Sequence, residues 1–371
     1  MLLRRLLVPF VLFLLILGMA AVFLPAKETN LGVDYLVATA AAEESLAVPE
    51  PIPGMLPPPE ATVNVDCRRP SDHETGMKQI AVSVATLWAE PGVARPKDER
   101  SLQNPVLLRD WLEPLSTREK LWFVGKLETQ ALLGTNVFVL EEGNEWVKVA
   151  IPEQNTPKRE EGYPGWMPKS QLAEVEFSYE ACPKAVVSLP TAFLHEAPDP
   201  SSPSVEISFN TLLPVLGEEE TWLVVDAPQG TRYVEKASVL METDIEASRE
   251  KLVETAQSFL GLPYIWSGAS GFGFDCSGFT YSLYRSIGIA IPRDAKDQAK
   301  AGEPIPSSEL LPGDLLFYAY DRGKGKVHHV AMYIGEGMMI HSPKTECPLE
   351  IIPMNTPAYA AEFAGARRFF P

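Results

Sequence analysis

The alternation of apolar and polar positions indicates a repeated β unit in the middle of the chain. Each copy has a short apolar strand, a turn containing proline, and then a tryptophan-centred strand with alternating apolar residues. The copies are carried by two pairs of segments, 85–92 with 192–199 and 144–152 with 220–228. Short strands separated by such turns predict two small β-barrels, at 76–178 and 185–242.

The first barrel is predicted to be longer than the second. The segment 104–130 has no counterpart in the second copy and reads as an insertion between its matching parts. Thr117 begins a capping-box-like pattern in which Lys120 stands where an acid is usual. We therefore expect a helix that starts at Thr117.

After residue 242 the apolar spacing becomes helical. Thr243 and Glu246 form a capping-box signature. Apolar residues follow at helical spacing, namely Leu252, Val253, Ala256, Phe259 and Leu260. A second helix is expected to begin at or just after Cys276 and to stop at Gly288.

Strand patterns complete this last part of the chain. Three are expected, at 314–320, 327–335 and 338–342. Helices followed by antiparallel strands predict an α+β domain over 243–371.

The N-terminus has the pattern of an export signal. Arg4 and Arg5 precede a run from Leu6 to Leu24 that contains no charged residue. We assign 1–26 to a signal peptide or, because the run is long enough to span a bilayer, to a retained membrane anchor. The following segment, 27–75, is rich in proline and is expected to be a disordered linker. Export would place the protein outside the cell or in the envelope.

Charge and cysteine content narrow the chemistry. The formal net charge of −17 argues against a nucleic-acid-binding surface. The four cysteines show no Cys/His spacing of a metal site, so neither a metal nor another cofactor is expected. Export permits disulfides, and Cys67 and Cys182 could join the two ends of one domain.

Cys276 lies in the stretch GFDCSGF (273–279), which reads as a tight turn before a helix. The positive end of the helix dipole is expected to favour the thiolate. On the strand 327–335, alternation sets His329 with Ala331 and Tyr333, and sets His328 on the opposite face with Val330 and Met332. His329 is thus the candidate base, and His341 on the next strand is placed to orient it.

These residues carry a specific resemblance. The ordered motifs LPYIWSG, GFDCSGF, GDLLFY, HHVAMYIG and IHS resemble those of the NlpC-type cysteine peptidase family, and the likeness covers 246–371. The resemblance implies a papain-like α+β domain behind two bacterial SH3-like barrels. It makes Cys276 the nucleophile, His329 the base and His341 its orienting residue, and gives Tyr264 a part in holding the oxyanion.

The domain order is similar to that of the γ-D-glutamyl-L-diamino acid endopeptidases of cell-wall recycling. That resemblance implies cleavage of peptidoglycan stem peptides after an L-Ala-γ-D-Glu unit, with the first barrel closing one end of the groove. Asp275, Glu128 and Tyr163 are the candidates to hold a free substrate ammonium. Three further residues are expected to line the D-glutamate pocket, namely Ser277, Asp294 and Ala295.

Two alternatives stay open. The chain could be a hydrolase of intact peptidoglycan whose barrels bind the wall, or a non-catalytic wall-binding protein. The sequence leaves open whether the diamino acid is lysine or diaminopimelate, and it leaves the oligomeric state open.

Overall fold

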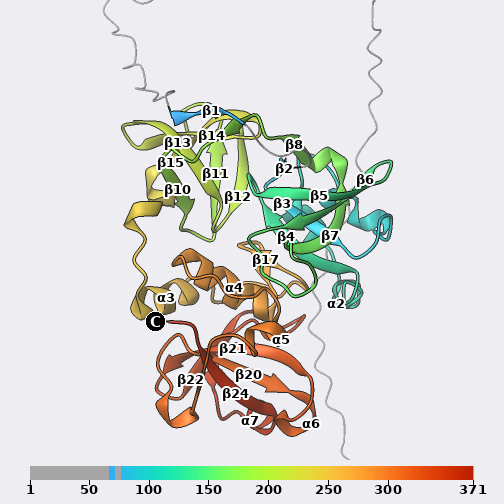
Figure 1. Ribbon diagram of the computed structural model, residues 1–371, viewed down its shortest axis with the longest axis vertical. Coiled ribbons are helices and arrows are strands. Elements are labelled where there is room, and N and C mark those ends of the chain that lie inside the picture. Colours follow the sequence, from blue (N-terminus) through green and yellow to red (C-terminus); the bar gives the residue numbers. More distant parts are fainter. Residues whose placement is uncertain (1–66, 72–76, 371) are drawn as a thin grey trace, which may run out of the picture. The chain divides into compact units, whose positions relative to one another are not determined.

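The computed structural model describes residues 67–71 and 77–370 (Figure 1). The expected signal or anchor (1–26) and most of the expected linker lie outside the described residues. In the part that is described, no helix is both long and apolar enough to cross a membrane. Residues 69–70 of the predicted linker are ordered, contrary to the prediction, because strand β1 (Arg69–Pro70) pairs with β9 (Phe177–Ser178).

The first β domain is a seven-stranded antiparallel sheet in the order β4–β3–β7–β6–β5–β2–β8. Its strands are β2 (Met77–Ile80), β3 (Val84–Trp88), β4 (Leu127–Leu132), β5 (Asn136–Glu142), β6 (Trp146–Ile151), β7 (Tyr163–Pro168) and β8 (Leu172–Glu174). Between β3 and β4 lie η2 (Pro96–Ser101), α1 (Leu108–Leu112) and α2 (Thr117–Leu121), and η3 (Lys169–Gln171) precedes β8. Every residue of β3 is buried, so this strand forms the centre of the domain core.

The predicted helix in the insertion exists, but its cap is shifted by one residue. The N-cap of α2 is Ser116, and Glu119 rather than Lys120 completes the capping box. The Glu119 carboxylate accepts hydrogen bonds from the backbone and the hydroxyl of Ser116, so the acid that the Thr117 reading lacked is present one position earlier.

The second β domain repeats the arrangement in the order β12–β11–β15–β14–β13–β10–β16. Its strands are β10 (Lys184–Val187), β11 (Thr191–His195), β12 (Ser204–Ser208), β13 (Leu212–Glu219), β14 (Trp222–Ala227), β15 (Gly230–Glu235) and β16 (Val239–Met241), with η4 (Lys236–Ser238) before the last strand. As the repeat predicted, β6 and β14 are the matching tryptophan-containing strands.

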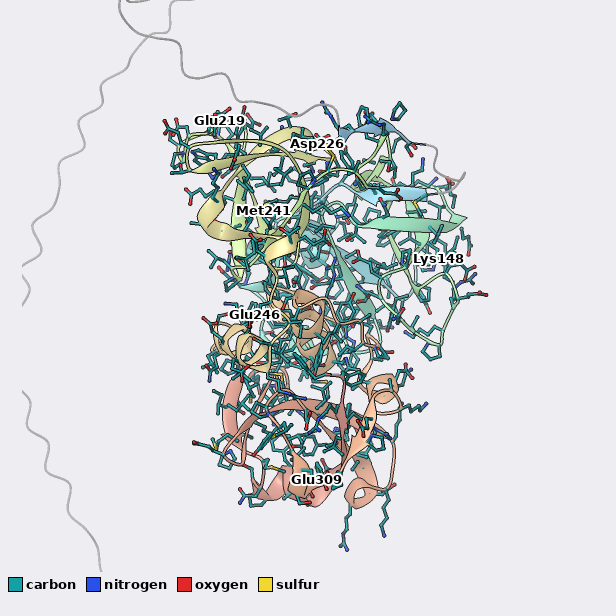
Figure 2. The ribbon with its side chains drawn as sticks, turned by 60° about the vertical axis from the view of Figure 1, so that its left-hand side comes forward. Lys148, Glu219, Asp226, Met241, Glu246 and Glu309 are labelled. Carbon is teal, nitrogen blue, oxygen red and sulfur yellow. A yellow bond between two sulfur atoms is a disulfide. The ribbon has the colours of Figure 1, made fainter. Side chains whose placement is uncertain are left out.

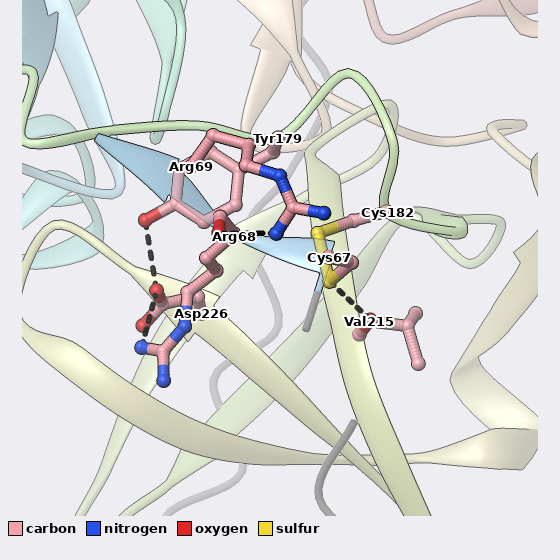
Figure 3. The surroundings of a disulfide bond; sticks show 7 residues. All are labelled: Cys67, Arg68, Arg69, Tyr179, Cys182, Val215 and Asp226. Atoms are coloured by element: carbon pink, nitrogen blue, oxygen red, sulfur yellow. Dashed lines mark hydrogen bonds and ion pairs between the residues drawn. A yellow bond between two sulfur atoms is a disulfide. The ribbon is translucent and has the colours of Figure 1, made fainter. Parts of the chain in front are cut away.

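A disulfide joins the residues on either side of the first β domain. Cys67 and Cys182 are bonded across a separation of 115 residues, which confirms the pairing that the sequence allowed (Figure 3). Both are buried against strands of the second domain, in a cluster with Leu216 and Val224. Nearby, Asp226 accepts a hydrogen bond from the Tyr179 hydroxyl at 2.8 Å, as Figure 3 shows. The bridge therefore ties the start of the first domain to the second.

The third domain has the predicted helices-then-strands order. Its mixed elements begin with η5 (Glu242–Asp244), α3 (Arg249–Gln257), β17 (Ala269–Ser270), β18 (Gly273–Phe274), α4 (Cys276–Ser286) and α5 (Ala295–Gln298). The remainder are β19 (Glu303–Ile305), η6 (Ser307–Glu309), β20 (Leu315–Ala319), α6 (Tyr320–Gly323), β21 (Val327–Gly335), β22 (Met338–His341), β23 (Glu350–Pro353), α7 (Pro357–Glu362) and β24 (Phe363–Arg368). Six strands form one sheet in the order β19–β24–β20–β21–β22–β23, and α4 packs against β21.

The first helix of this domain starts later than predicted. Its N-cap is Ser248, whose side chain accepts a hydrogen bond from the Lys251 amide, whereas Thr243 lies in a short 3-10 turn. Glu246, labelled in Figure 2, therefore precedes the helix instead of completing its cap. A serine side chain nearer the apolar run satisfied the amides of the first turn.

The β17–β18 hairpin brings the first and third domains into contact. The Gln130 side chain on β4 accepts hydrogen bonds from the Ala269 amide and the Ser270 hydroxyl, each at 2.9 Å. Ile265 and Phe272 belong to the same apolar cluster as the core of the first domain. The start of α4 is thus held next to strand β4.

The disulfide should contribute measurably to thermal stability. Crosslinks that close loops of this length typically stabilise by about 2–4 kcal/mol, so the Cys67→Ser/Cys182→Ser double variant should melt roughly 5 °C or more below the wild type. Scanning calorimetry measures the difference, and Cys347→Ser, which removes a free thiol, is the control. Identical thermograms for the double variant and the wild type would contradict the prediction.

Candidate active site

The turn before α4 is fixed by Asp275 and Gly278. Asp275 is the N-cap of α4, and its Oδ1 accepts a hydrogen bond of 2.6 Å from the Gly278 amide. A Cβ on Gly278 would lie 1.9 Å from the carbonyl oxygen of Gly268, so no other residue fits this close backbone approach. The glycine and the aspartate of the GFDCSGF motif therefore place Cys276 at the first position of the helix.

Arg293 is the centre of the site, and the sequence reasoning did not select it. Its side chain is 1% exposed and donates to both carboxylate oxygens of Asp275, at 3.1 and 3.0 Å. The same guanidinium donates to the Ser277 hydroxyl at 3.1 Å and to Thr129 Oγ1 at 3.0 Å. Burial alone lowers the pKa of Arg293, but the Asp275 charge raises it above its ordinary value. In the sequence, the signal that could have pointed to Arg293 was its position next to Asp294, a candidate substrate residue.

Asp275 has protein partners on both of its carboxylate oxygens. Its carboxylate is shared between the Gly278 amide and the Arg293 guanidinium, instead of facing an empty ammonium subsite. Ser277 is also engaged, since its hydroxyl donates to Asp275 while it accepts from Arg293. Both residues thus contact Arg293 on either side of Cys276, and their contacts with a substrate stay predictions.

The expectation that Cys276 favours its thiolate is wrong for the free enzyme. Although the residue keeps some exposed surface, burial raises the pKa of its thiol to about 12, and the Asp275 charge adds to the increase. The backbone amides of Val330 and Ser277 donate toward the sulfur and act in the opposite direction. Burial outweighs the helix dipole here because the thiolate loses its hydration.

His329 and His328 face different surroundings, as predicted. A β-bulge, and not regular alternation, separates the two side chains. β20 and β21 pair Tyr318 with His329 and then Ala319 with Val327, so His328 is the extra residue. The His328 ring stacks on Tyr320 at 4.3 Å, and its Nε2 lies 3.1 Å from Glu362 Oε2. Simple alternation had placed His328 on one face with Val330 and Met332, but His328 does not join these two residues in the core.

The two predicted catalytic histidines are in direct contact. His329 Nε2 lies 2.8 Å from His341 Nδ1, and His341 Nε2 lies 3.4 Å from Glu350 Oε1, within ion-pair range but without hydrogen-bond geometry. If His329 is to accept a proton at Nδ1, its Nε2–H must donate to His341 Nδ1. His341 then carries its proton on Nε2, on the side of Glu350.

The predicted nucleophile lies on α4, which packs against β21, the strand of the predicted base. The amide that donates toward the Cys276 sulfur belongs to Val330, the residue after His329. The Cys276 and His329 side chains themselves are not hydrogen-bonded to each other in this structure, and catalytic hydrogen bonds are often loose before substrate binds.

Tyr359 on α7 is a second residue that the sequence did not indicate. Its ring centroid lies 5.6 Å from that of His329 and 5.0 Å from that of His341.

The two histidines have lowered pKa values. Burial lowers the pKa of His329 well below its ordinary value, and the His341 and His328 charges lower it further. Burial also lowers the pKa of His341 to about 4. Both imidazoles are therefore neutral at neutral pH.

Tyr264 forms an isolated β-bridge with Phe274, two residues before Cys276. Burial, followed by the charges of Cys276 and Asp275, raises its pKa well above the ordinary value. Its hydroxyl therefore stays protonated and can donate a hydrogen bond, as the oxyanion role requires.

The remaining predicted substrate residues form a cluster between the first and third domains. The Tyr163 hydroxyl of β7 donates to Asp294, 3.1 and 3.3 Å from its two oxygens. The Lys158 ammonium donates to Glu128 Oε2 and to the Tyr163 oxygen, each at 2.6 Å. Ala295, the first residue of α5, is buried directly after Asp294. The structure thus brings Glu128, Tyr163 and Asp294 together, one residue away from the Arg293–Thr129 contact.

Only one of the adjacent histidines should be essential. His329→Ala should abolish turnover, because it removes the group that contacts His341 next to the nucleophile, whereas His328→Ala should keep most of the rate. Steady-state kinetics on a stem peptide measures both. Loss of activity in His328→Ala but not in His329→Ala would show that His328, and not His329, is the base.

The buried histidines should make stability fall in mild acid. A folded-state pKa of about 4 against 6.5 in the unfolded chain means that the unfolded state binds the proton more tightly. The stability is complete above pH 6.5 and is lost as the pH falls toward 4, by up to about 3 kcal/mol for His341. Denaturant melts from pH 7 to pH 4 should show a shallower decline for His341→Gln than for the wild type, and equal slopes would contradict this.

Family models match all three domains. The model described as the NlpC/P60 family matches residues 261–368. The model of the bacterial dipeptidyl-peptidase Sh3 domain matches 123–172, and that of the YKFC SH3b2 domain matches 187–241. These matches confirm the two SH3-like barrels and the peptidase domain that the sequence motifs resembled.

Similar proteins share this domain order. A γ-D-glutamyl-L-lysine dipeptidyl-peptidase of Bacillus cereus is 49% identical over 301 residues, which cover 79% of this chain and 90% of that protein. The protein of the same description from Bacillus subtilis is 41% identical, over 79% of this chain and 99% of its own length. The crystal structure of an NlpC/P60 family protein from Bacillus cereus superposes with a TM-score of 0.76 at 48% identity, and the match covers 80% of this chain and 100% of that one. The chain therefore belongs to the NlpC/P60 family of cysteine peptidases, with two SH3-like domains before the peptidase domain.

Proposed function

We propose that this enzyme hydrolyses the γ-D-glutamyl–diamino acid bond of peptidoglycan stem peptides that begin with a free L-alanine. The observation that carries the proposal is the cluster of Glu128, Tyr163 and Asp294, which Arg293 connects to Asp275, the residue before Cys276. The two relatives described as γ-D-glutamyl-L-lysine dipeptidyl-peptidases support the choice of bond. The proposal does not depend on whether the diamino acid is lysine or diaminopimelate.

The acceptor cluster suits a terminal ammonium. Two carboxylates and a phenol offer several acceptors for the three N–H groups of an ammonium. Burial and the Asp294 charge raise the pKa of Tyr163, so its hydroxyl remains a donor to Asp294 and presents its oxygen lone pairs as acceptors. An N-acylated alanine would bring no positive charge to this cluster.

The proposed reaction begins with the neutral pair. The Cys276 sulfur attacks the γ-carbonyl carbon of D-glutamate while its proton passes to His329 Nδ1, and the carbonyl π electrons move to the oxygen. The oxyanion would be held by the amide of Cys276, which has no acceptor within the helix, and by the Tyr264 hydroxyl.

The intermediate then collapses to a thioester. The C–N bond breaks, and His329 returns its proton to the leaving amine of the diamino acid. Water attacks the thioester carbon, gives a proton to His329, and releases L-Ala-D-Glu as the sulfur is reprotonated. His341 supports each step by accepting the His329 Nε2–H.

We also propose that the protein works outside the cytoplasm. Disulfides persist in oxidising compartments, and the Cys67–Cys182 bond fits an exported chain. The apolar run from Leu6 to Leu24 would provide the export signal or the anchor.

Defined peptides test the proposed selectivity. The enzyme should cleave L-Ala-γ-D-Glu-L-Lys at least ten- to a hundredfold more efficiently than its N-acetyl form, since a charged hydrogen bond contributes about 1.5–3 kcal/mol. Mass spectrometry of timed digests gives both rates, and Cys276→Ala should cleave neither peptide. Equal cleavage of the two peptides, or release of peptides from intact sacculi, would favour a wall hydrolase instead.

The acceptor cluster can be tested separately. Glu128→Gln should raise KM for the free-amine peptide and leave the slow cleavage of the acetylated peptide unchanged. Glu174→Gln is the matched control, because Glu174 pairs with Lys78 at an exposed position of the same domain. If Glu128→Gln slows both peptides equally, the cluster does not read the ammonium.

A further inference from the structure

We propose that Lys158 occupies the substrate's ammonium subsite in the empty enzyme, and that the terminal ammonium of the substrate must displace it. The inference rests on the proposed function, because it takes the Glu128–Tyr163–Asp294 cluster as that subsite. It makes Lys158 a residue that sets how tightly, and therefore how selectively, a free amine is bound.

The contacts of Lys158 are those that the substrate ammonium needs. Its Nζ is 2.6 Å from Glu128 Oε2, 2.6 Å from the Tyr163 oxygen and 4.0 Å from the centroid of the Tyr163 ring. Tyr163 in turn donates to Asp294. A lysine side chain and a peptide N-terminus both present a primary ammonium, so the two cannot satisfy the same acceptors at once.

The position of Lys158 allows it to leave. It lies on the connection between β6 and β7, where residues 157–161 are exposed, and its side chain is 30% exposed while it makes these contacts. Tyr163 by contrast is buried within β7, and Glu128 is fixed on β4. The acceptors are therefore held by strands, whereas the cation that fills them is on a surface loop.

Charge balance explains why the subsite would hold its own cation. Glu128 and Asp294 bring two carboxylates to one phenol, and Lys158 compensates part of that charge when no substrate is bound. Arg293 is bonded to Asp275, and Lys296 lies 3.6 Å from Asp294, so Lys158 is the cation that pairs with Glu128. A substrate ammonium replaces the Lys158 charge and keeps the subsite neutralised, while an uncharged N-acyl group does not.

Removal of the competing ammonium should therefore tighten binding. Half-exposed ion pairs are weak, so we expect Lys158→Met to lower KM for L-Ala-γ-D-Glu-L-Lys by roughly two- to fivefold, with the larger effect on KM than on kcat. Lys158→Arg keeps a cation and should stay near the wild-type value. Lys169→Met is the control, because Lys169 makes a comparable exposed pair with Glu142 elsewhere in the first domain.

A direct binding measurement separates displacement from other effects. In calorimetric titrations, the dipeptide L-Ala-γ-D-Glu should bind more tightly to the Cys276→Ala/Lys158→Met double variant than to the Cys276→Ala single variant. Mass spectrometry should show that the dipeptide speeds the labelling of Lys158 by an amine-reactive reagent and leaves Lys169 unchanged.

The outcomes distinguish the two proposals. If the wild type prefers the free amine but Lys158→Met has an unchanged or raised KM, the displacement of Lys158 is wrong and the proposed function stands. If the wild type cleaves free and acetylated peptides equally, the proposed function fails, and the displacement fails with it. A lowered KM for the free peptide alone, together with faster Lys158 labelling, supports both.

Discussion

The buried guanidinium of Arg293 is the interaction on which the rest of the site depends. A charge that is 1% exposed is tolerable only when every N–H has an acceptor. The acceptors here come from the hairpin, the N-cap of α4 and a strand of the first SH3-like domain, through Gly268, Asp275 and Thr129. One side chain therefore fixes the turn that carries Cys276 and attaches it to a neighbouring domain, and loss of Asp275 would leave the guanidinium as an uncompensated buried charge.

The same burial determines the resting state of the catalytic groups. Water is excluded from the Cys276 thiol and from both imidazoles, which keeps all three uncharged. The Cys276 thiol then loses its proton only as the substrate reacts, because the oxyanion and the imidazolium form together in the transition state. A site built in this way holds no exposed thiolate between turnovers, which limits oxidation of Cys276.

The first SH3-like domain contacts the segments on both sides of Cys276. Glu128 and Thr129 are consecutive on β4, and Arg293 and Asp294 are consecutive before α5, so one contact between these pairs aligns the others. In the proposed function, substrate selection and the support of Cys276 share this junction. The proposal thereby gives a barrel without chemistry of its own a means to restrict a peptidase to one end of a peptide.

The sequence by itself determined the order of the elements and which residues are the candidates to react. Repeated Trp-centred strands, the GFDCSGF turn and the spacing of His329 and His341 are local patterns, and local patterns persist in the fold. Only the tertiary structure decided the charge states and the partners. Arg293, Tyr359 and Lys158 act through contacts with residues distant in the chain, and the pKa of Cys276 follows from burial, which no local pattern reports. The helix dipole visible in sequence was real, but desolvation, a property of the packed site, outweighed it.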